Sequence, residues 1–525
     1  MRRSVVALFT LSTLVAHVAV VAAALSVAGC SSAPEGPEAL GVPASSESAP
    51  VPDGGAQGRT GEPPPPPPAA KADELTEAFG IFVTENGAAD AAGTRAAPLA
   101  SIGAALLKAK AEKKSVFVCE GSYPEALMLE SGVSIRGGLD CSGPEWKLTT
   151  RQSTLAAPAS PAVRASGVAL PTRVDNLAIV APNATSPDAD RSSIGVLAVD
   201  SAALTFTNGL IRAGAARAGV DGVDPARLWP RIVRTATTGL PSAPICVDSG
   251  PFSFCDAPRS GGLGARIQCL DAAGALVSES SGDDGGHSGV FIPLSGHPYW
   301  ASQKPAGAAT GGSGVTTTVQ GTDGAPGAGA LTDEGFLPGD GTAGTSGGPG
   351  AWGRGGRGQG PSERGTMGVR YWGRSGAGGG AGGCAGLSGT PGTGGGASVG
   401  VMALRSPLRL VSMTIESGAG GAAGKGTFGS PASSGLRGGD DHGSSVPLPT
   451  SPGSFDGEAG GVAGVSGNGA AGPSYGVVHR GGAPVLVAVQ VKNGVGGAGV
   501  PARSVGAKTL AATPAGEAEG VKALP

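Results

Sequence analysis

The chain contains one glycine-terminated string in three versions, and this repetition restricts the possible folds more than any other feature of the sequence. The versions are Ser193–Gly214 (SIGVLAVDSAALTFTNGLIRAG), Ser398–Gly421 (SVGVMALRSPLRLVSMTIESGAGG) and Ser474–Gly497 (SYGVVHRGGAPVLVAVQVKNGVGG). Apolar and polar residues alternate strictly from Val411 to Glu416, and a period of two indicates a strand with one buried face. A single strand of this kind cannot bury that face alone. The repetition therefore predicts stacked coils that share an apolar axis.

Aligning the versions predicts which residues stack on one another. The alignment groups Phe206 with Leu410 and Leu486, Ile211 with Ile415 and Val491, and Arg212 with Glu416 and Lys492. The last group would stack exposed charges as plus, minus, plus. Opposite charges across a ladder are favoured, by roughly 0.2–1 kcal/mol for exposed pairs. The segment Thr172–Ala181 reads as one more coil of the same kind.

The distances between the versions are irregular, and the intervening sequence is dominated by Gly, Ala, Ser and Pro. The chain has 97 Gly and 43 Pro among 525 residues, a level typical of low-complexity sequence. Solenoids tolerate long insertions at their corners because loop-closure entropy grows only logarithmically with length. We find no strict Gly-X-Y period, which excludes collagen. Irregular loops are the favoured interpretation, and glycines packed as tight extended coils are the alternative.

Before the first string, the sequence predicts a short strand, a helix and three further strands. The helix opens near Pro98, and its apolar face consists of Leu99, Ile102, Ala105, Leu106 and Ala109. The strands are expected in GIFVTENG before it and in SVFVCEG, ALMLESG and VSIRGG after it.

This N-terminal part resembles the opening of exported right-handed parallel β-helix proteins with the pectin-lyase-like architecture. The shared pattern is a Gly-Thr turn, a Pro-led capping helix, V-x-V-x-x-G-x-Y-x-E and then V-x-I-x-G-G, and it covers about 65 residues. In this chain the positions are Gly93, Thr94, Pro98, Val116, Val118, Gly121, Tyr123, Glu125, Val133, Ile135, Gly137 and Gly138. The glycine-rich remainder resembles deltaproteobacterial surface proteins described as PGRS-like. The resemblance implies an all-β fold: a short right-handed parallel β-helix with an N-terminal capping helix and long glycine-rich loops.

The first thirty residues have the pattern of an export signal: Arg2 and Arg3, then an apolar run that ends at Cys30. Val27-Ala28-Gly29-Cys30 resembles the lipobox of bacterial lipoproteins, which implies that Cys30 is lipidated and anchors the chain in a membrane, with the outer membrane favoured. The alternative is an uncleaved membrane helix. A Pro-rich tether follows, with six prolines from Pro63 to Pro68 that favour an extended, unfolded spacer.

Six further cysteines favour disulfides in an exported chain: Cys119, Cys141, Cys246, Cys255, Cys269 and Cys384. Cys119 with Cys141 is the expected pair. Cys246 with Cys255 is the nearest remaining pair and the simplest second guess. A zinc site is disfavoured because the chain has no C-x₂-C spacing. Residues 229–300 are expected to form a small disulfide-stapled β insertion.

Two clusters of acids and histidine are weak metal candidates: Asp283, Asp284 and His287, and Asp440, Asp441 and His442. Carboxylates suit hard ions such as calcium and imidazole suits softer ones, but both clusters also read as ordinary glycine turns. The second cluster superficially resembles polygalacturonase motifs. In those enzymes the acids come from separate coils, whereas here they are adjacent. Asp175, Asp200 and Arg212 could serve a β-elimination lyase, but no pattern distinguishes them.

We therefore expect no catalytic residue, no cofactor except possible calcium, and a lipid-anchored envelope protein that provides structure, adhesion or carbohydrate contact. The partners would be the membrane and a polysaccharide or envelope component, and the net charge of −3 argues against nucleic acid. A polysaccharide lyase, hydrolase or epimerase on the same scaffold is the alternative, and a protease or its inhibitor is a third class. The expected parts are a signal peptide (1–29), tether (30–72), capping helix and coils (73–215), glycine-rich insertion (216–396), further coils (397–497) and flexible tail (498–525).

Overall fold

The computed structural model describes residues 75–185, 191–241, 259–294, 297–304, 306–309, 311–360, 362–364, 369–371, 373–440 and 453–525. All of them belong to one compact unit, Pro65–Pro525. Within these residues the fold is all-β, with a single helix and several parallel sheets. No helix in these ranges is long and apolar enough to cross a membrane.

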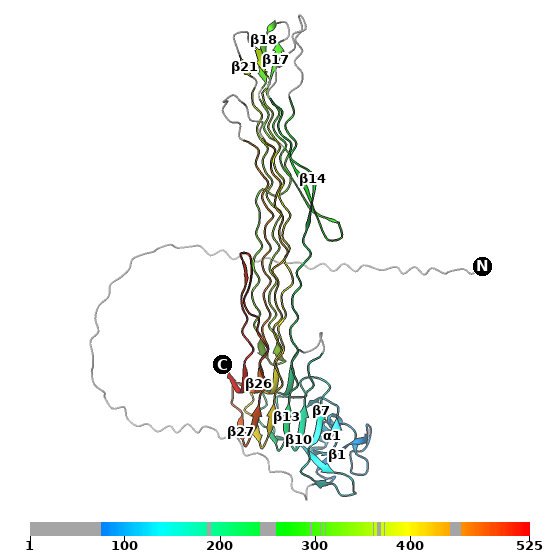
Figure 1. The fold of residues 1–525 in the computed structure, drawn as a ribbon. Coiled ribbons are helices and arrows are strands. Elements are labelled where there is room, and N and C mark those ends of the chain that lie inside the picture. The colour runs from blue at the N-terminus through cyan, green and yellow to red at the C-terminus, as the bar shows by residue number, and fades with distance from the viewer. Residues whose placement is uncertain are drawn as a thin grey trace, which may run out of the picture. The chain divides into compact units, whose positions relative to one another are not determined.

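Three parallel sheets contain most of the strands, and successive coils add one strand to each (Figure 1). Sheet A contains β2 (Ser115–Cys119), β5 (Ile135–Asp140), β9 (Thr172–Asp175), β12 (Leu204–Thr207), β24 (Arg409–Val411) and β27 (Val485–Val487), with β1 (Gly80–Ala88) beside β2 and β6 (Lys147–Leu148) antiparallel to β5. Sheet B contains β3 (Ser122–Tyr123), β7 (Ser153–Ala156), β10 (Leu177–Val180), β13 (Leu210–Arg212), β25 (Thr414–Glu416) and β28 (Gln490–Lys492). Sheet C contains β4 (Leu127–Met128), β8 (Val163–Ser166), β11 (Ser193–Val199), β23 (Ser398–Leu404), β26 (Ser474–Arg480) and β31 (Ala518–Leu524). We call these three sheets the coil stack.

The register predicted by aligning the three strings is confirmed. Phe206 pairs with Leu410 and Leu410 with Leu486, while Ile211, Ile415 and Val491 form the matching row in sheet B. Each string contains three strands, one from each sheet. The alternating run from Val411 is therefore not one strand, because Ser412 has a φ of 51° and turns the chain from β24 into β25.

The core of the coil stack is made of inward-facing apolar side chains from all three sheets, among them Val174, Phe206 and Leu410. The helix α1 (Ile102–Glu112) packs on this core. It begins later than Pro98, because Ser101 is its N-cap and accepts a hydrogen bond from the Ala104 backbone. The Glu125 carboxylate accepts hydrogen bonds from the Ile102 and Gly103 backbone at 2.6 and 3.0 Å, which favours an acid at this positive helix end.

The glycine-rich segments leave the coil stack at one corner. In each of the last three coils the chain departs after the sheet B strand and returns at the sheet C strand, over 213–397, 417–473 and 493–517. We call the glycine-rich parts of these excursions the glycine bundle. They also contain β14 (Trp229–Arg234), β15 (Arg266–Leu270), β16 (Leu276–Ser281), β17 (Val290–Leu294), β18 (His297–Lys304), β19 (Ala330–Thr332), β20 (Gly335–Leu337), β21 (Ser362–Arg364), β22 (Val369–Tyr371), β29 (Arg503–Val505) and β30 (Lys508–Leu510).

The prediction of irregular glycine-rich loops is wrong for the described residues, because the segments run side by side as extended, hydrogen-bonded chains (Figure 1). Three successive amides, those of Gly378, Gly379 and Gly380, donate to three different segments, at Thr237, Asp283 and Phe455. A hydrogen-bond direction that repeats every three residues is the geometry of a polyproline II helix. The alternative of tightly packed extended glycines describes this region better.

The ladder of the coils continues into the glycine bundle. Beyond the β13–β25 pair, the amides of Ala213, Ala216, Gly219 and Gly222 donate to carbonyls three residues apart in the neighbouring segment, beginning at Glu416. Between segments 341–359 and 374–392 the bonded pairs run antiparallel from Gly341–Gly392 to Gln359–Arg374. Eighteen residues at about 3.1 Å each give this ladder a length of roughly 55 Å.

Glycine is required where neighbouring backbones come this close. A β-carbon added at Gly353 or Gly382 would collide with the carbonyl oxygen of Phe455 or Gly350. At the outside of the bundle, hydroxyl and carboxylate side chains accept the remaining amides: Thr393 Oγ1 accepts from Val220 at 2.7 Å. The prediction of a flexible tail over 498–525 is corrected by the structure. This segment forms β29, β30 and β31, and β31 pairs with β26.

Two disulfides lie within the described residues. The expected pair Cys119–Cys141 is present, and Cys269 of β15 is joined to Cys384 of a central glycine segment. The second bond links the 229–300 region to the glycine bundle, so this region is not stapled on itself at Cys269. Cys246 and Cys255 lie outside the described residues, as does Cys30.

Candidate functional site

The outer face of sheet C is covered by a hairpin that belongs to the glycine bundle. The hairpin consists of β19 and β20, and its Leu331 and Phe336 pack against Leu197, Met402 and other outward side chains of β11, β23 and β26. Both faces of β11 and β23 are thus buried, since Val196 and Val401 point into the core. A strand covered on both faces reads as a continuous apolar run, which explains SVGVMAL in β23.

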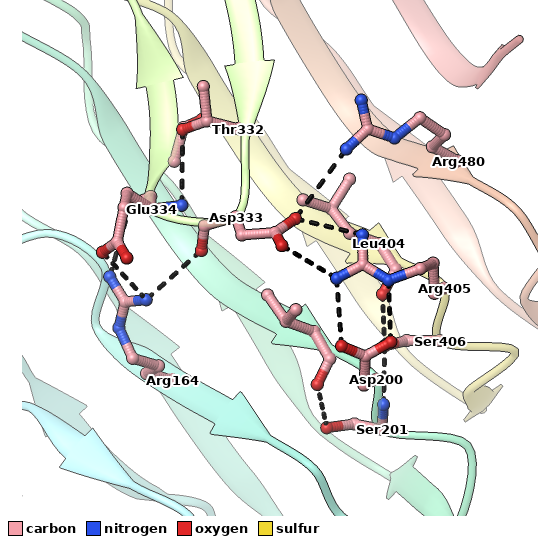
Figure 2. A network of polar contacts seen from close by, with 12 residues as sticks. Arg164, Asp200, Ser201, Thr332, Asp333, Glu334, Leu404, Arg405, Ser406 and Arg480 are labelled. Carbon is pink, nitrogen blue, oxygen red and sulfur yellow. Dashed lines mark hydrogen bonds and ion pairs between the residues drawn. The ribbon is translucent and has the colours of Figure 1, made fainter.

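Charged residues from several coils converge at the tip of this hairpin (Figure 2). Arg405 forms two hydrogen bonds with Asp200, at 2.7 and 3.0 Å, and two with Asp333 of the hairpin turn, at 3.1 and 2.9 Å. Asp200 and Arg405 occupy the same corner of successive coils, each with a φ near 50°. Arg480, one coil further, lies 3.8 Å from Asp333.

A second arginine holds the other side of the same turn. Arg164 of β8 donates to the carbonyl oxygens of Asp333 and Glu334, and its guanidinium lies 3.7 Å from the Glu334 carboxylate. Within the turn, Thr332 Oγ1 accepts from the Glu334 amide and donates to the Gly335 carbonyl. We call Arg164, Asp200, Asp333, Glu334, Arg405 and Arg480 the hairpin clamp.

The electrostatics of the hairpin clamp favour fixed ion pairs. Hydrogen bonds from Arg405 hold the pKa of Asp200 and the pKa of Asp333 below their usual range, and the two carboxylates raise the pKa of Arg405. A general acid or base works best with a pKa near the working pH, and these shifts move all three groups away from it. The arrangement can fasten the hairpin to the coil stack, but it is not tuned for proton transfer.

Asp175, Asp200 and Arg212, the residues considered for a lyase, each form hydrogen bonds or ion pairs with other residues. Asp175 is buried and accepts hydrogen bonds from Thr207 and Asn208 at 2.5 and 3.0 Å. Asp200 belongs to the hairpin clamp. Arg212 lies 2.7 Å from Glu416, and Lys492 lies 3.5 Å from the same carboxylate, so the predicted plus, minus, plus row is confirmed.

The metal candidates that lie within the described residues contact backbone groups of the glycine bundle. Asp283 Oδ1 accepts from the Gly312 amide and Asp284 Oδ1 from the Gly264 amide, both at 2.7 Å, while His287 Nδ1 lies 3.1 Å from the Ser288 carbonyl oxygen. No group of three or more possible metal ligands occurs in the described ranges. Asp440 is exposed at the edge of a described segment, and Asp441 and His442 lie outside the described residues.

Sequence reasoning missed the hairpin clamp. A signal was available in LTDEGF, because Thr-Asp-Glu-Gly between Leu331 and Phe336 is typical of a tight hairpin turn. The sequence does not reveal that this turn faces Arg405, 72 residues away. No protein-family model, no curated protein and no solved structure matches this chain.

Proposed function

We propose that this chain is an exported, lipid-anchored display scaffold without catalytic activity, which presents β-hairpins on a glycine stalk for contact with a polysaccharide or envelope component. The coil stack serves as the base and the glycine bundle as the stalk. The observation that supports this proposal best is the continuous ladder from coil stack to glycine bundle, because it makes a rigid spacer out of nearly side-chain-free sequence. The convergent charges, which an enzyme would use, are instead occupied in fastening the hairpin.

We further propose that the coil stack is a right-handed parallel β-helix of the pectin-lyase-like kind. The parallel strand order in three sheets and the N-terminal helix on the core are compatible with it. The strong preference of parallel crossover connections for the right hand supports the handedness.

The lipid anchor rests on Val27-Ala28-Gly29-Cys30 and on two disulfides that suit an oxidising compartment. Its test is expression of the chain and of Cys30→Ala in a bacterial host, followed by membrane fractionation and mass spectrometry of the N-terminal peptide. We expect a chain that begins at acylated Cys30 in the membrane fraction, and loss of both the acyl group and the cleavage before residue 30 with Cys30→Ala. An unacylated chain of full length in the membrane would contradict the anchor and favour a retained helix.

The face proposed for glycan contact is the outward side of β14–β15–β16. Trp229 is 55% exposed there, in a cross-strand row with Leu270 and Leu276. Gln268 and Arg266 beside this row hydrogen-bond to Glu279. An exposed aromatic ring flanked by fixed planar polar groups is a surface suited to sugar rings, whose faces are apolar and whose edges carry hydroxyls.

The test is a glycan array probed with the full chain carrying Cys30→Ala, run beside a depolymerisation assay with calcium. We expect binding without cleavage, and about tenfold or greater loss of binding with Trp229→Ala. The matched control is Phe455→Ala, which removes another exposed aromatic side chain from the glycine bundle. Cleavage of any polyuronate would overturn the non-catalytic proposal, and equal binding by both variants would overturn the assigned face.

A further inference from the structure

The sheet β14–β15–β16 is fastened to the glycine bundle through its inner face (Figure 1). On this face Ile267 and Cys269 are buried and pack against Ala381 and Cys384 of a central glycine segment. The Cys269–Cys384 disulfide adds a covalent link. The outer face, which carries the exposed Trp229, is therefore presented to solvent on a fixed support.

The three strands of this sheet carry an excess of positive charge. They contain three arginines and one acid, which are Arg231, Arg234, Arg266 and Glu279. Both carboxylate oxygens of Glu279 are occupied, since Arg266 and Gln268 donate to them at 2.8 and 2.7 Å. Hydrogen bonds from Gln268 and Arg266 also hold the pKa of Glu279 below its usual range, so this acid stays charged and paired. It therefore does not neutralise the other cations of the surface.

Two exposed arginines next to Trp229 have no acid partner. Arg231 lies two residues along β14 on the same face as Trp229, opposite Gln268. The guanidinium of Arg227 lies over the Trp229 ring, 4.6 Å from its centroid. Within the part of the chain that the structure describes, neither Arg227 nor Arg231 lies within ion-pair distance of an acid. Stacking uses the flat face of a guanidinium and leaves its in-plane N–H donors available.

We propose that this face binds an anionic polysaccharide, with carboxylates on Arg227 and Arg231 and a sugar ring on Trp229. The inference rests on the glycan contact proposed above and names the class of glycan. A guanidinium matches a carboxylate with two parallel hydrogen bonds. Residues two apart in a strand lie roughly 6.8 Å apart, so one disaccharide can reach Trp229 and Arg231 together.

The number and the setting of these cations favour a polysaccharide over a single-stranded nucleic acid. Both partners use aromatic rings and arginines, but a nucleic acid is held by a positive groove that follows its phosphates. This face offers two unpaired guanidinium groups, and the whole chain has a net charge of −3. The carboxylates of an acidic polysaccharide are separated by whole sugar units, which suits a few cations beside a ring.

The experiment measures binding of the full chain carrying Cys30→Ala to hyaluronate and to polymannuronate, each compared with its carboxyl-reduced form. Reduction turns every carboxylate into a neutral hydroxymethyl group and keeps the sugar backbone. We expect about tenfold tighter binding to at least one carboxylate polymer than to its reduced form. This difference should shrink at high salt, because salt screens exposed charges.

Substitutions assign the preference to the two arginines. Arg227→Gln and Arg231→Gln should each weaken binding to the carboxylate polymer about fivefold and leave binding to the reduced polymer unchanged. Both side chains are exposed, so the fold does not depend on them. Trp229→Ala should weaken binding to both polymers. Arg354→Gln, which removes an exposed arginine elsewhere in the glycine bundle, is the matched control and should bind normally.

The outcomes separate this inference from the proposed function. Equal binding to carboxylate and reduced polymers, with both weakened by Trp229→Ala, would overturn the anionic ligand and leave the glycan contact standing. Absence of binding to these polymers and to every glycan of the array would overturn both. Unchanged binding by both arginine variants would overturn the inference, as would tighter binding of single-stranded oligothymidylate than of either polymer.

Discussion

The coil stack and the glycine bundle continue one hydrogen-bonded ladder, but they fill their interiors differently. In the coil stack, side chains such as Phe206 and Leu410 fill the space between three sheets. In the glycine bundle, backbones lie so close that a β-carbon at Gly353 would strike a neighbouring carbonyl. Sheets packed face to face lie far enough apart for apolar side chains to fill the space between them. A glycine chain that is hydrogen-bonded to neighbours in three directions leaves no room for side chains.

The comparison teaches that glycine-rich sequence can be ordered when its amides have partners. Gly378, Gly379 and Gly380 satisfy their amides in three neighbours, and surface residues such as Thr393 accept the amides that point outward. A buried backbone group without a hydrogen-bond partner destabilises the folded state. The hydrogen bonds of these amides therefore help to offset the large conformational entropy that glycine loses on folding. Threonine and aspartate in these segments therefore act as caps for neighbouring chains.

The largest predicted effect concerns the side-chain core of the coil stack. Phe206→Ala should lower the free energy of unfolding by about 3–5 kcal/mol, because Phe206 is fully buried and its removal leaves a cavity. Leu486→Ala is the control in the same row two coils later, where the side chain is already partly in water, and it should cost roughly 1 kcal/mol or less. Denaturant unfolding checks both. Equal losses would mean that the stack is not filled as described.

The next largest effect concerns the close packing of glycine backbones in the glycine bundle. Gly353→Ala should cost about 1–3 kcal/mol, because the added methyl group forces two chains apart. Gly143→Ala is the matched control, since nothing lies within 4 Å of its β-position and its φ is not positive. The measurement is thermal unfolding of the two variants side by side. If both are neutral, the glycine segments do not pack against one another.

A smaller effect concerns the corner between sheets A and B. Asn176, Asn208, Ser412 and Ala488 occupy this corner in successive coils, all with a φ near +50°. Asparagine tolerates this conformation better than alanine, so Ala488→Asn should stabilise the protein by about 0.5–1 kcal/mol. Ala512→Asn lies at an exposed position with ordinary φ and should give no gain. Calorimetry of the two variants distinguishes a corner effect from a general effect of asparagine.

The smallest predicted effect concerns the hairpin clamp, where the β19–β20 hairpin of the glycine bundle is fastened to the coil stack. The pKa values of Asp200 and Asp333 are lowered by Arg405, so their contribution to docking the hairpin is present above the usual carboxyl pKa of about 3.9. It is lost as the pH falls through the lower values of the folded state. The protection factor of residues 330–337, which is the intrinsic exchange rate at each pH divided by the observed rate, should decrease as the pH is lowered below about 4. The variant Arg405→Met should exchange faster already at pH 7 and show a weaker pH dependence, and an unchanged variant would contradict the clamp.

Part of this architecture could be predicted from the sequence because side-chain period and repetition report on strands. The stacking of Phe206 on Leu410, the charge row at Arg212 and the bond between Cys119 and Cys141 followed from local patterns. The glycine bundle was missed because we sought one strict Gly-X-Y period along the whole insertion. The period is kept within each segment, as at Gly380, Gly383 and Gly386, and is interrupted by other residues between segments. The Cys269–Cys384 bond and the hairpin clamp depend on how the segments pack, which no local pattern reports.

The most direct test of the account is amide hydrogen exchange of the central glycine segment, 376–396, measured by mass spectrometry on the full chain. The amides of this segment donate to neighbours on several sides, so we predict exchange as slow as that of β23, which follows it in the same chain. A synthetic peptide of the same sequence, which has no neighbours, provides the rate of the unprotected chain. Exchange of 376–396 in the full protein at the rate of that peptide would contradict the central claim that glycine backbones form an ordered core.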